Sequence, residues 1–104
     1  MRSMEREFFL GFIKIHILHH ASKEPVYGLW LIEELGRHGY RLSPGTLYPM
    51  LRSMEEQGLL KSRREIVGGK VRKYYRATKK GERALADSLE KIRELVKEVL
   101  EGGG

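Results

Sequence analysis

Hydrophobic residues recur along the chain with a helical period in four stretches and with a strand-like period in one. In the first stretch, residues 5–21, eight of the eleven residues from Phe8 to Leu18 are apolar. At 3.6 residues per turn they cover most of the circumference of a helix rather than one stripe. A helix that is apolar on two faces needs two partners, so we expect one face to pack on its own domain and the other on a second chain.

The second and third helices are shorter. Apolar residues at helical spacing predict a second helix from residue 26 or 27 to residue 37. Ser43 at the N-cap and Pro44 at the first helical position are typical of a helix start, so the third helix is expected to run to about residue 57. Pro49 has no N–H to donate to the preceding turn, which predicts a kinked or frayed first turn; a helix that begins at Pro49 is the alternative.

Residues 59–78 have a different pattern, rich in β-branched and aromatic residues. Gly68-Gly69 divides them into two runs, which predicts a hairpin with a two-residue turn. Such a turn pairs Val67 with Lys70 and so sets the register of every other pair. The apolar residues on one face of the hairpin are then Leu60, Ile66, Val71 and Tyr75.

The same register places charged residues opposite one another. Arg64 lies opposite Lys73, and this pair of like charges costs stability unless an anion bridges it or the strands splay into solvent. The pairs expected to attract are Glu65 with Arg72 as an ion pair and Arg63 with Tyr74 as a cation–π contact.

Thr78 is the expected N-cap of a fourth helix, Lys79 to about Leu100, whose apolar residues repeat at spacings of four and three. The preceding domain is too small to cover a helix of about 33 Å, at 1.5 Å per residue. We therefore expect its apolar seam and the second face of the first helix to form a homodimer, with a helix folded back on its own domain as the alternative. The predicted dimerisation residues are Phe9, Phe12, Ile13, Leu85, Leu89, Ile92, Val96 and Val99.

Positive charge is concentrated in one part of the chain. The net charge is +6 and the pI about 9.7, and because residues 79–104 are neutral the excess lies in residues 1–78. Residues 61–76 hold seven basic residues and only Glu65 as an acid. Such a cluster indicates a surface that binds a polyanion such as nucleic acid, although a merely solvated surface has a similar composition.

The composition excludes several classes of protein. There is no Cys, so disulfides and thiolate metal sites are excluded. No stretch of about 20 uncharged apolar residues is present, and Lys14 interrupts the first apolar run, so we expect neither a membrane span nor a signal peptide but a soluble cytoplasmic protein. With no Asn and 33% charged residues, the chain resembles proteins adapted to heat.

Three helices, a basic hairpin and a fourth helix, in this order, predict a mainly helical α+β fold. The expected architecture is a winged helix-turn-helix domain (1–78), a C-terminal dimerisation helix (79–101) and a disordered tail (102–104). In this fold the third helix enters the major groove of double-stranded DNA, and the hairpin, or wing, contacts phosphates or the minor groove.

Several motifs at fixed separation resemble one family. The run Ser-Pro-Gly-Thr-Leu-Tyr-Pro-Met-Leu at 43–51, the Leu-Leu pair at 59–60, and residues 69–81 with their Tyr-x-x-Thr-x-x-Gly block resemble the PadR-like transcriptional regulators, as does the run at 25–28. The single helix after the wing is similar to that family's compact subgroup. The resemblance implies a winged-helix homodimer that represses transcription, subunit contacts through the first and fourth helices, and a third helix that begins near Ser43.

The predicted DNA contacts lie at the start of the second helix, on the third helix and on the wing. Hydroxyls near a helix N-terminus can bind phosphates or base edges, but Tyr48 packed under the wing and Ser43 acting only as a cap are alternatives. Arg52 as a solvated surface residue and Tyr27 as a core residue are alternatives of the same kind. The predicted set is Tyr27, Ser43, Thr46, Tyr48, Arg52, Arg64, Lys70, Arg72 and Lys73.

Enzymatic chemistry finds little support in the sequence. No nucleophile with a positioned base and no phosphate-binding glycine loop is apparent, so we expect neither an enzyme nor a cofactor. His16 and His20 lie one turn apart on the first helix, but no acidic residue accompanies them nearby, so no metal site is predicted. A small-molecule effector between the subunits is left open.

Two other functions are compatible with the same fold. A non-specific architectural protein would bind all duplexes alike, whereas a repressor should prefer a near-palindromic operator by about three decades or more. A winged-helix protein-interaction module would not respond to the loss of the basic residues of the wing.

Overall fold

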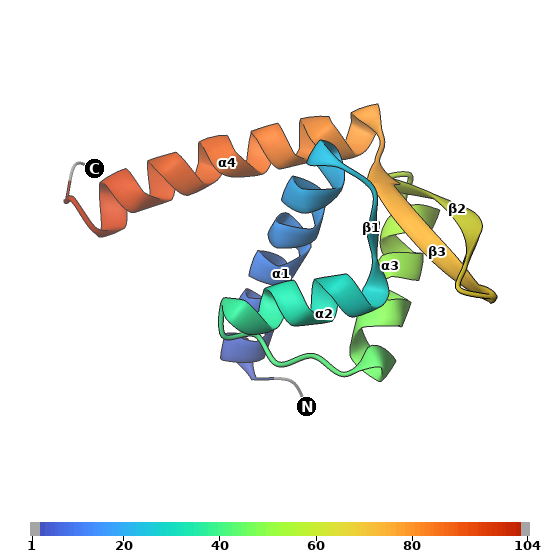
Figure 1. Ribbon diagram of the computed structural model, residues 1–104. Helices are drawn as coiled ribbons and strands as arrows, with labels where there is room; N and C mark the ends of the chain where they lie inside the picture. The colour runs from blue at the N-terminus through green and yellow to red at the C-terminus, as the bar shows by residue number, and fades with distance from the viewer. Residues whose placement is uncertain (1–2, 103–104) are drawn as a thin grey trace.

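The computed structural model describes residues 3–102 and contains four helices and three strands within that range. The predicted α+β class is confirmed (Figure 1). The elements are α1 (Met4–Lys23), β1 (Val26–Tyr27), α2 (Gly28–Arg37), α3 (Pro44–Glu56), β2 (Leu60–Val67), β3 (Lys70–Ala77) and α4 (Lys79–Val99). Of the predicted tail, Gly103 and Gly104 lie outside the described residues.

The strand β1 corrects the predicted start of the second helix. Val26 and Tyr27 are extended and pair with Tyr75 and Tyr74 of β3, so α2 begins only at Gly28. The sheet therefore has three antiparallel strands in the order β1-β3-β2. A two-residue strand is too short to show an alternating pattern in a sequence, and a turn of amphipathic helix follows it directly.

The hairpin of β2 and β3, which we call the wing, has the predicted register from Val67 opposite Lys70 to Leu60 opposite Ala77. Gly68 and Gly69 have φ of +60° and +78°. Both central positions of a tight hairpin turn need positive φ, which glycine adopts without steric cost, and this explains why the pair determines the register.

Helix α3 begins at Pro44, next to Ser43, and contains Pro49 without a break, so the alternative start at Pro49 is wrong. Ser43 has extended N-cap geometry, but its side chain makes no capping hydrogen bond to the backbone and instead lies 3.4 Å from the Thr46 hydroxyl. The backbone carbonyl of Ser43 accepts from Leu47, so the first turn of the helix is closed by the main chain.

The hydrophobic core lies among α1, α2, α3 and the base of the sheet. The fully buried side chains include Ile17, Leu31, Leu35, Leu47, Leu51, Met54 and Leu60. Of the apolar face predicted for the wing, Leu60 and Tyr75 belong to this core, whereas Ile66 and Val71 are 77% and 66% exposed. The outer half of the wing projects past the core into solvent (Figure 1), which explains the difference.

Helix α4 joins the core only through its first turns. The hydroxyl of Thr78 accepts from Gly81 N–H at 3.0 Å, which confirms the predicted N-cap, and donates to the carbonyl of Gly58. A Cβ at Gly81 would lie 2.1 Å from the carbonyl oxygen of Leu59, so only glycine allows this close crossing. Leu85 is buried in the same core, and beyond it α4 passes α1 and continues away from the wing (Figure 1).

None of the helices between residues 3 and 102 is both long and apolar enough to span a membrane.

Candidate nucleic-acid interface

The exposed face of α3 is held in place by its buried face. Leu47, Met50, Leu51 and Met54 pack into the core, which turns the side of the helix that carries Tyr48 and Arg52 outward. The side chain of Tyr48 lies against Gly28 at the start of α2. The contact is so close that a Cβ at Gly28 would be 2.5 Å from the Tyr48 hydroxyl oxygen. The ring is still 39% exposed, so Tyr48 packs against the fold and also faces solvent.

A groove of about 360 Å³ lies between the start of α2, the exposed side of α3 and the outer half of the wing. We call it the wing groove. It brings together five of the residues predicted to contact DNA, although they lie in three separate parts of the sequence. The residues that line it are Tyr27, Gly28, Leu29, Tyr48, Val67, Lys70, Val71, Arg72 and Lys73.

Aromatic rings and guanidinium groups contact one another along one side of this groove. The Arg72 guanidinium lies 4.0 Å from the ring centroid of Tyr27, and the rings of Tyr27 and Tyr74 meet edge to face at 5.5 Å. Arg63 lies over the other part of the stack, 5.7 Å from the Tyr74 centroid, so the predicted cation–π contact is confirmed. A hydrogen bond to Tyr74 raises the pKa of Arg72 further, so this residue is a fixed positive charge.

Glu65 and Arg72 lie opposite each other as predicted, but their side chains do not form an ion pair. The Glu65 carboxylate instead accepts from Arg63 Nε at 2.6 Å, on its own strand. Arg72 turns toward Tyr27 of β1, the strand that the sequence pattern did not reveal. Because β1 places Tyr27 beside the wing, Arg72 contacts this ring instead of Glu65.

The like-charge pair Arg64 and Lys73 is relieved by an acid from another element. Glu55 of α3 lies 3.5 Å from Lys73 Nζ and accepts from the Ser62 hydroxyl at 2.6 Å. The Ser62 hydrogen bond, followed by the charges of Lys73 and Arg64, holds the pKa of Glu55 below its ordinary value, although partial burial opposes the shift. The anion beside Lys73 is therefore the carboxylate of Glu55, which partly neutralises the lysine. Lys70 and Arg72 take part in none of the described ion pairs.

The remaining predicted DNA contacts lie outside the wing groove. Ser43 and Thr46 sit at the N-terminus of α3, Arg52 is exposed one turn beyond Tyr48, and Arg64 is exposed on β2. These four residues are close in sequence to residues of the wing groove, but they do not line it.

Lys80, a cation in the first turn of α4, has an intramolecular partner. Its ammonium donates to the carbonyl of Gln57 at 2.8 Å, at the C-terminal end of α3, where the helix dipole favours a positive charge. This contact explains why a lysine is placed at the start of α4.

The Tyr-x-x-Thr-x-x-Gly block serves the fold and not the interface. Tyr75 is buried in the core, Thr78 caps α4, and Gly81 permits the close crossing over Leu59. The sequence did not point to Glu55, nor to the contact of Tyr74 with Tyr27. Each is recognisable only once the partner on another element is known.

A second surface, apolar instead of basic, lies between α1 and α4, and we call it the α1–α4 surface. Two hollows of about 560 and 700 Å³ flank the crossing of these helices, and Phe12, Ile15 and Leu95 line both of them. Of the predicted dimerisation residues, Phe12, Leu85, Leu89, Ile92 and Val96 line the first hollow, and Val99 is 64% exposed further along α4.

Two other predicted dimerisation residues lie elsewhere. Ile13 is 3% exposed and belongs to the chain's own core, so it has little area left for a partner. The ring of Phe9 meets Tyr40 edge to face at 6.2 Å and lines a separate hollow.

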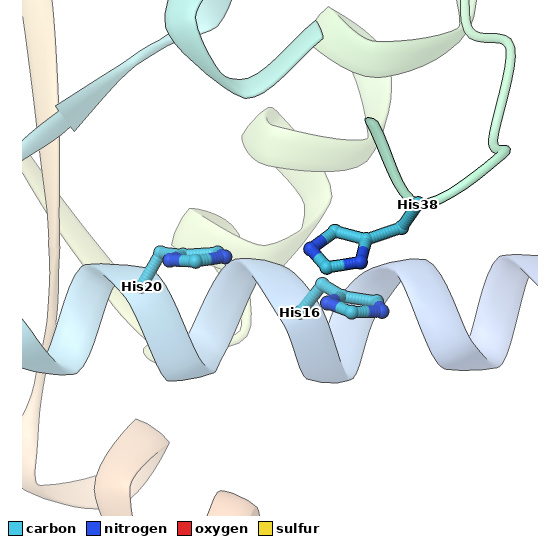
Figure 2. A group of neighbouring side chains, drawn as sticks. All are labelled: His16, His20 and His38. Carbon is cyan, nitrogen blue, oxygen red and sulfur yellow. The ribbon is translucent and has the colours of Figure 1, made fainter. Parts of the chain in front are cut away.

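The histidines of α1 meet residues that are distant in sequence. Figure 2 shows His38, at the C-terminal end of α2, with its ring over that of His16 and with His20 one turn along α1. Glu34 of α2 approaches both His20 and His38, at 3.5 and 3.1 Å. The expectation that no acidic residue lies nearby is therefore wrong, because the fold brings α2 against α1.

Comparison with known proteins identifies the same architecture. Residues 17–87 match the family described as the transcriptional regulator PadR-like family. The chain is 50% identical over 97 residues to the transcriptional regulator Rv3488 of Mycobacterium tuberculosis, covering 93% of this chain and 91% of that protein.

Solved structures agree with this result. A PadR family transcriptional regulator from Eggerthella lenta is 37% identical, with a TM-score of 0.82 over 94% of this chain and 87% of that one. A PadR family transcription regulator from Clostridium difficile is 28% identical, with a TM-score of 0.79 over 89% and 99% of the two chains.

Proposed function

Because this chain belongs to the PadR-like family of transcriptional regulators, we propose that it binds double-stranded DNA as a homodimer and represses transcription at a near-palindromic operator. The observation that carries the proposal is the wing groove, where Tyr27, Tyr48, Lys70 and Arg72 converge beside the exposed face of α3. Cations and hydroxyls from three elements on one surface match the needs of a phosphate backbone.

The two parts of the interface have different tasks. The exposed side of α3 presents Thr46, Tyr48 and Arg52 toward the major groove, where side chains can reach base edges. The wing supplies Lys70 and Arg72, which contact phosphates and so set the position of α3 along the duplex. Sequence preference then comes from α3 and most of the affinity from the wing.

The α1–α4 surface supports the proposal of a homodimer. Leu95, Val96, Val99 and Leu100 are 36–77% exposed in the single chain, and continuous apolar exposure of this kind on a small protein marks a contact with another protein. A two-fold axis through this surface places two copies of α3 on one duplex, with half-sites about 34 Å apart. An effector that binds at the α1–α4 surface would act by changing the angle between the DNA-binding domains of the two subunits.

The test compares two doubly substituted variants by fluorescence anisotropy on a labelled operator duplex, identified by footprinting next to the protein's own gene. Lys70→Ala with Arg72→Ala removes two wing cations, and Lys91→Ala with Lys97→Ala removes the same charge from α4. We expect the first pair to weaken binding about 10- to 100-fold and to lower the salt slope by about 0.9 for each lost phosphate contact. The second pair should leave both nearly unchanged.

Three results would contradict the proposal. Equal effects of the two pairs would mean that net charge alone drives binding. Equal affinity for operator and random duplex would favour a non-specific architectural protein. No binding of the unsubstituted protein to any duplex in dilute buffer would favour a protein-interaction module.

A further inference from the structure

We propose that His16, His20 and His38, together with Glu34, bind one divalent transition-metal ion of the zinc class. The nitrogen ligand atoms of the three histidines lie within 4.8 Å of one another, and they come from two helices that pack together (Figure 2). The Glu34 carboxylate completes a set of three imidazoles and one oxygen, which is a ligand set that zinc sites use.

Two distances between the proposed ligand atoms are close to those of a tetrahedral site. With metal–ligand distances of about 2.0–2.2 Å, two ligand atoms of a tetrahedral site are about 3.3–3.6 Å apart. Glu34 Oε2 lies 3.5 Å from His20 Nε2 and 3.1 Å from His38 Nε2. The ring of His16 now stacks on that of His38 with the centroids 4.7 Å apart, so it would have to tilt away for its nitrogen to reach the same ion.

The carboxylate is held in the orientation that such a site needs. Arg37 donates to Oε1 of Glu34 at 2.9 Å, which leaves Oε2 directed toward His20 and His38. The Glu34 side chain is only 12% exposed and that of His20 18%, so water competes weakly for these atoms. A second partner that orients a ligand in this way is typical of built metal sites.

The chemistry of the ligand atoms indicates which ions the cluster would take. Nitrogen ligands with a single carboxylate favour Zn²⁺, Co²⁺ or Ni²⁺ over Mg²⁺ or Ca²⁺, which prefer oxygen ligands.

The position of the cluster gives metal binding a mechanical effect. His38 is the C-cap of α2 and directly precedes the link to α3, while His16 also lines the hollow between α1 and α4. An ion held by all three histidines fixes α1 against the end of α2. This regulatory part rests on the proposed function: the ion would set the angle at which each α3 meets DNA.

Metal binding itself is tested on the full chain without DNA. Titration with Co²⁺ should produce the intense visible absorption of a tetrahedral site, saturating at one ion per chain and displaced by Zn²⁺. His38→Gln, at a position where the side chain is 45% exposed, should keep the fold and weaken binding at least about tenfold. The matched control is His19→Gln, an exposed neighbour on α1 outside the cluster, and it should bind like the unsubstituted protein.

Two outcomes overturn the site. Co²⁺ that gives no saturable band at one ion per chain shows that the four groups do not form a centre. A His19→Gln variant as weak as His38→Gln shows that histidine number, and not this geometry, attracts the metal.

The regulatory part has a separate test. Zn²⁺ should change the affinity of the unsubstituted protein for its operator at least about fivefold, and should not do so in His38→Gln. An unchanged affinity in both proteins shows that the ion does not regulate. Absence of DNA binding with and without Zn²⁺ contradicts the proposed function and leaves the cobalt result standing.

Discussion

The wing groove and the α1–α4 surface are both exposed, but they differ in how far their side chains are contacted by other residues of the same chain. In the wing groove, three of the side chains have an intramolecular partner: Arg72 lies on Tyr27, Tyr48 on Gly28, and Lys73 beside Glu55. On the α1–α4 surface, Leu95 and Val99 are 55% and 64% exposed with no comparable cover. A rigid polar surface is suited to an external ligand, whereas an apolar surface without cover is suited to a copy of itself.

The largest expected effect is at the α1–α4 surface. Leu95→Glu places a charge where both hollows meet, and burying that charge against a second chain is costly. We expect a monomer in sedimentation equilibrium and a loss of operator affinity of at least about 100-fold, because the two half-sites are then bound independently.

Lys91→Gln is the matched control for this change. It alters the charge of α4 by the same amount, on a side of the helix lined by Asp87, Glu90 and Glu94. It should remain a dimer with normal affinity, and a dimeric Leu95→Glu would place the subunit contact elsewhere.

The next effect is at the joint between the two regions, where α4 crosses Leu59. Gly81→Ala puts a Cβ against a backbone carbonyl that cannot rotate away, so we expect a loss of about 2–3 kcal/mol of unfolding free energy. Gly36→Ala, at a helical position of α2 with open space around it, should instead be neutral or slightly stabilising. Urea denaturation measures both, and equal stability of the two variants would show that α4 does not depend on the close crossing.

A smaller effect is expected when the contact between Arg72 and the ring of Tyr27 in the wing groove is removed. Tyr27→Ala removes the ring on which Arg72 lies, and a cation–π contact of about 0.5–1 kcal/mol corresponds to a two- to fivefold loss of DNA affinity. Tyr27→Phe keeps the ring, so it should retain affinity if the ring positions Arg72. If Phe and Ala are equally weak, the Tyr27 hydroxyl is itself the DNA contact.

The smallest effect is a pH dependence within the wing. The folded protein lowers the pKa of Glu55 below its ordinary value, so the charged carboxylate stabilises the fold above that value. This contribution is lost as the pH falls below the ordinary pKa, 4.5, and through the lowered one. In Glu55→Gln, the unfolding free energy should decrease less over that pH range than in the unsubstituted protein, with a difference below about 1 kcal/mol. Thermal unfolding between pH 3 and 7 measures this difference.

Local sequence determined the elements whose causes are local. Gly68-Gly69 specified the turn and therefore every pair of the wing, Thr78 specified the start of α4, and Ser43-Pro44 the start of α3. Each of these signals acts over a few residues through backbone sterics or capping, and needs no knowledge of the rest of the chain. The basic cluster likewise indicated the wing as the charged face.

Only the tertiary structure decided which side chains meet. Tyr27 acquired Arg72 through a strand too short to be seen in the sequence, Glu55 reached Lys73 from another helix, and Glu34 and His38 joined the histidines of α1. Contacts across elements depend on how helices and sheet pack around the core, and the spacing of residues along one element carries no information about its neighbours. Both the wall of the wing groove and the histidine cluster are products of that packing.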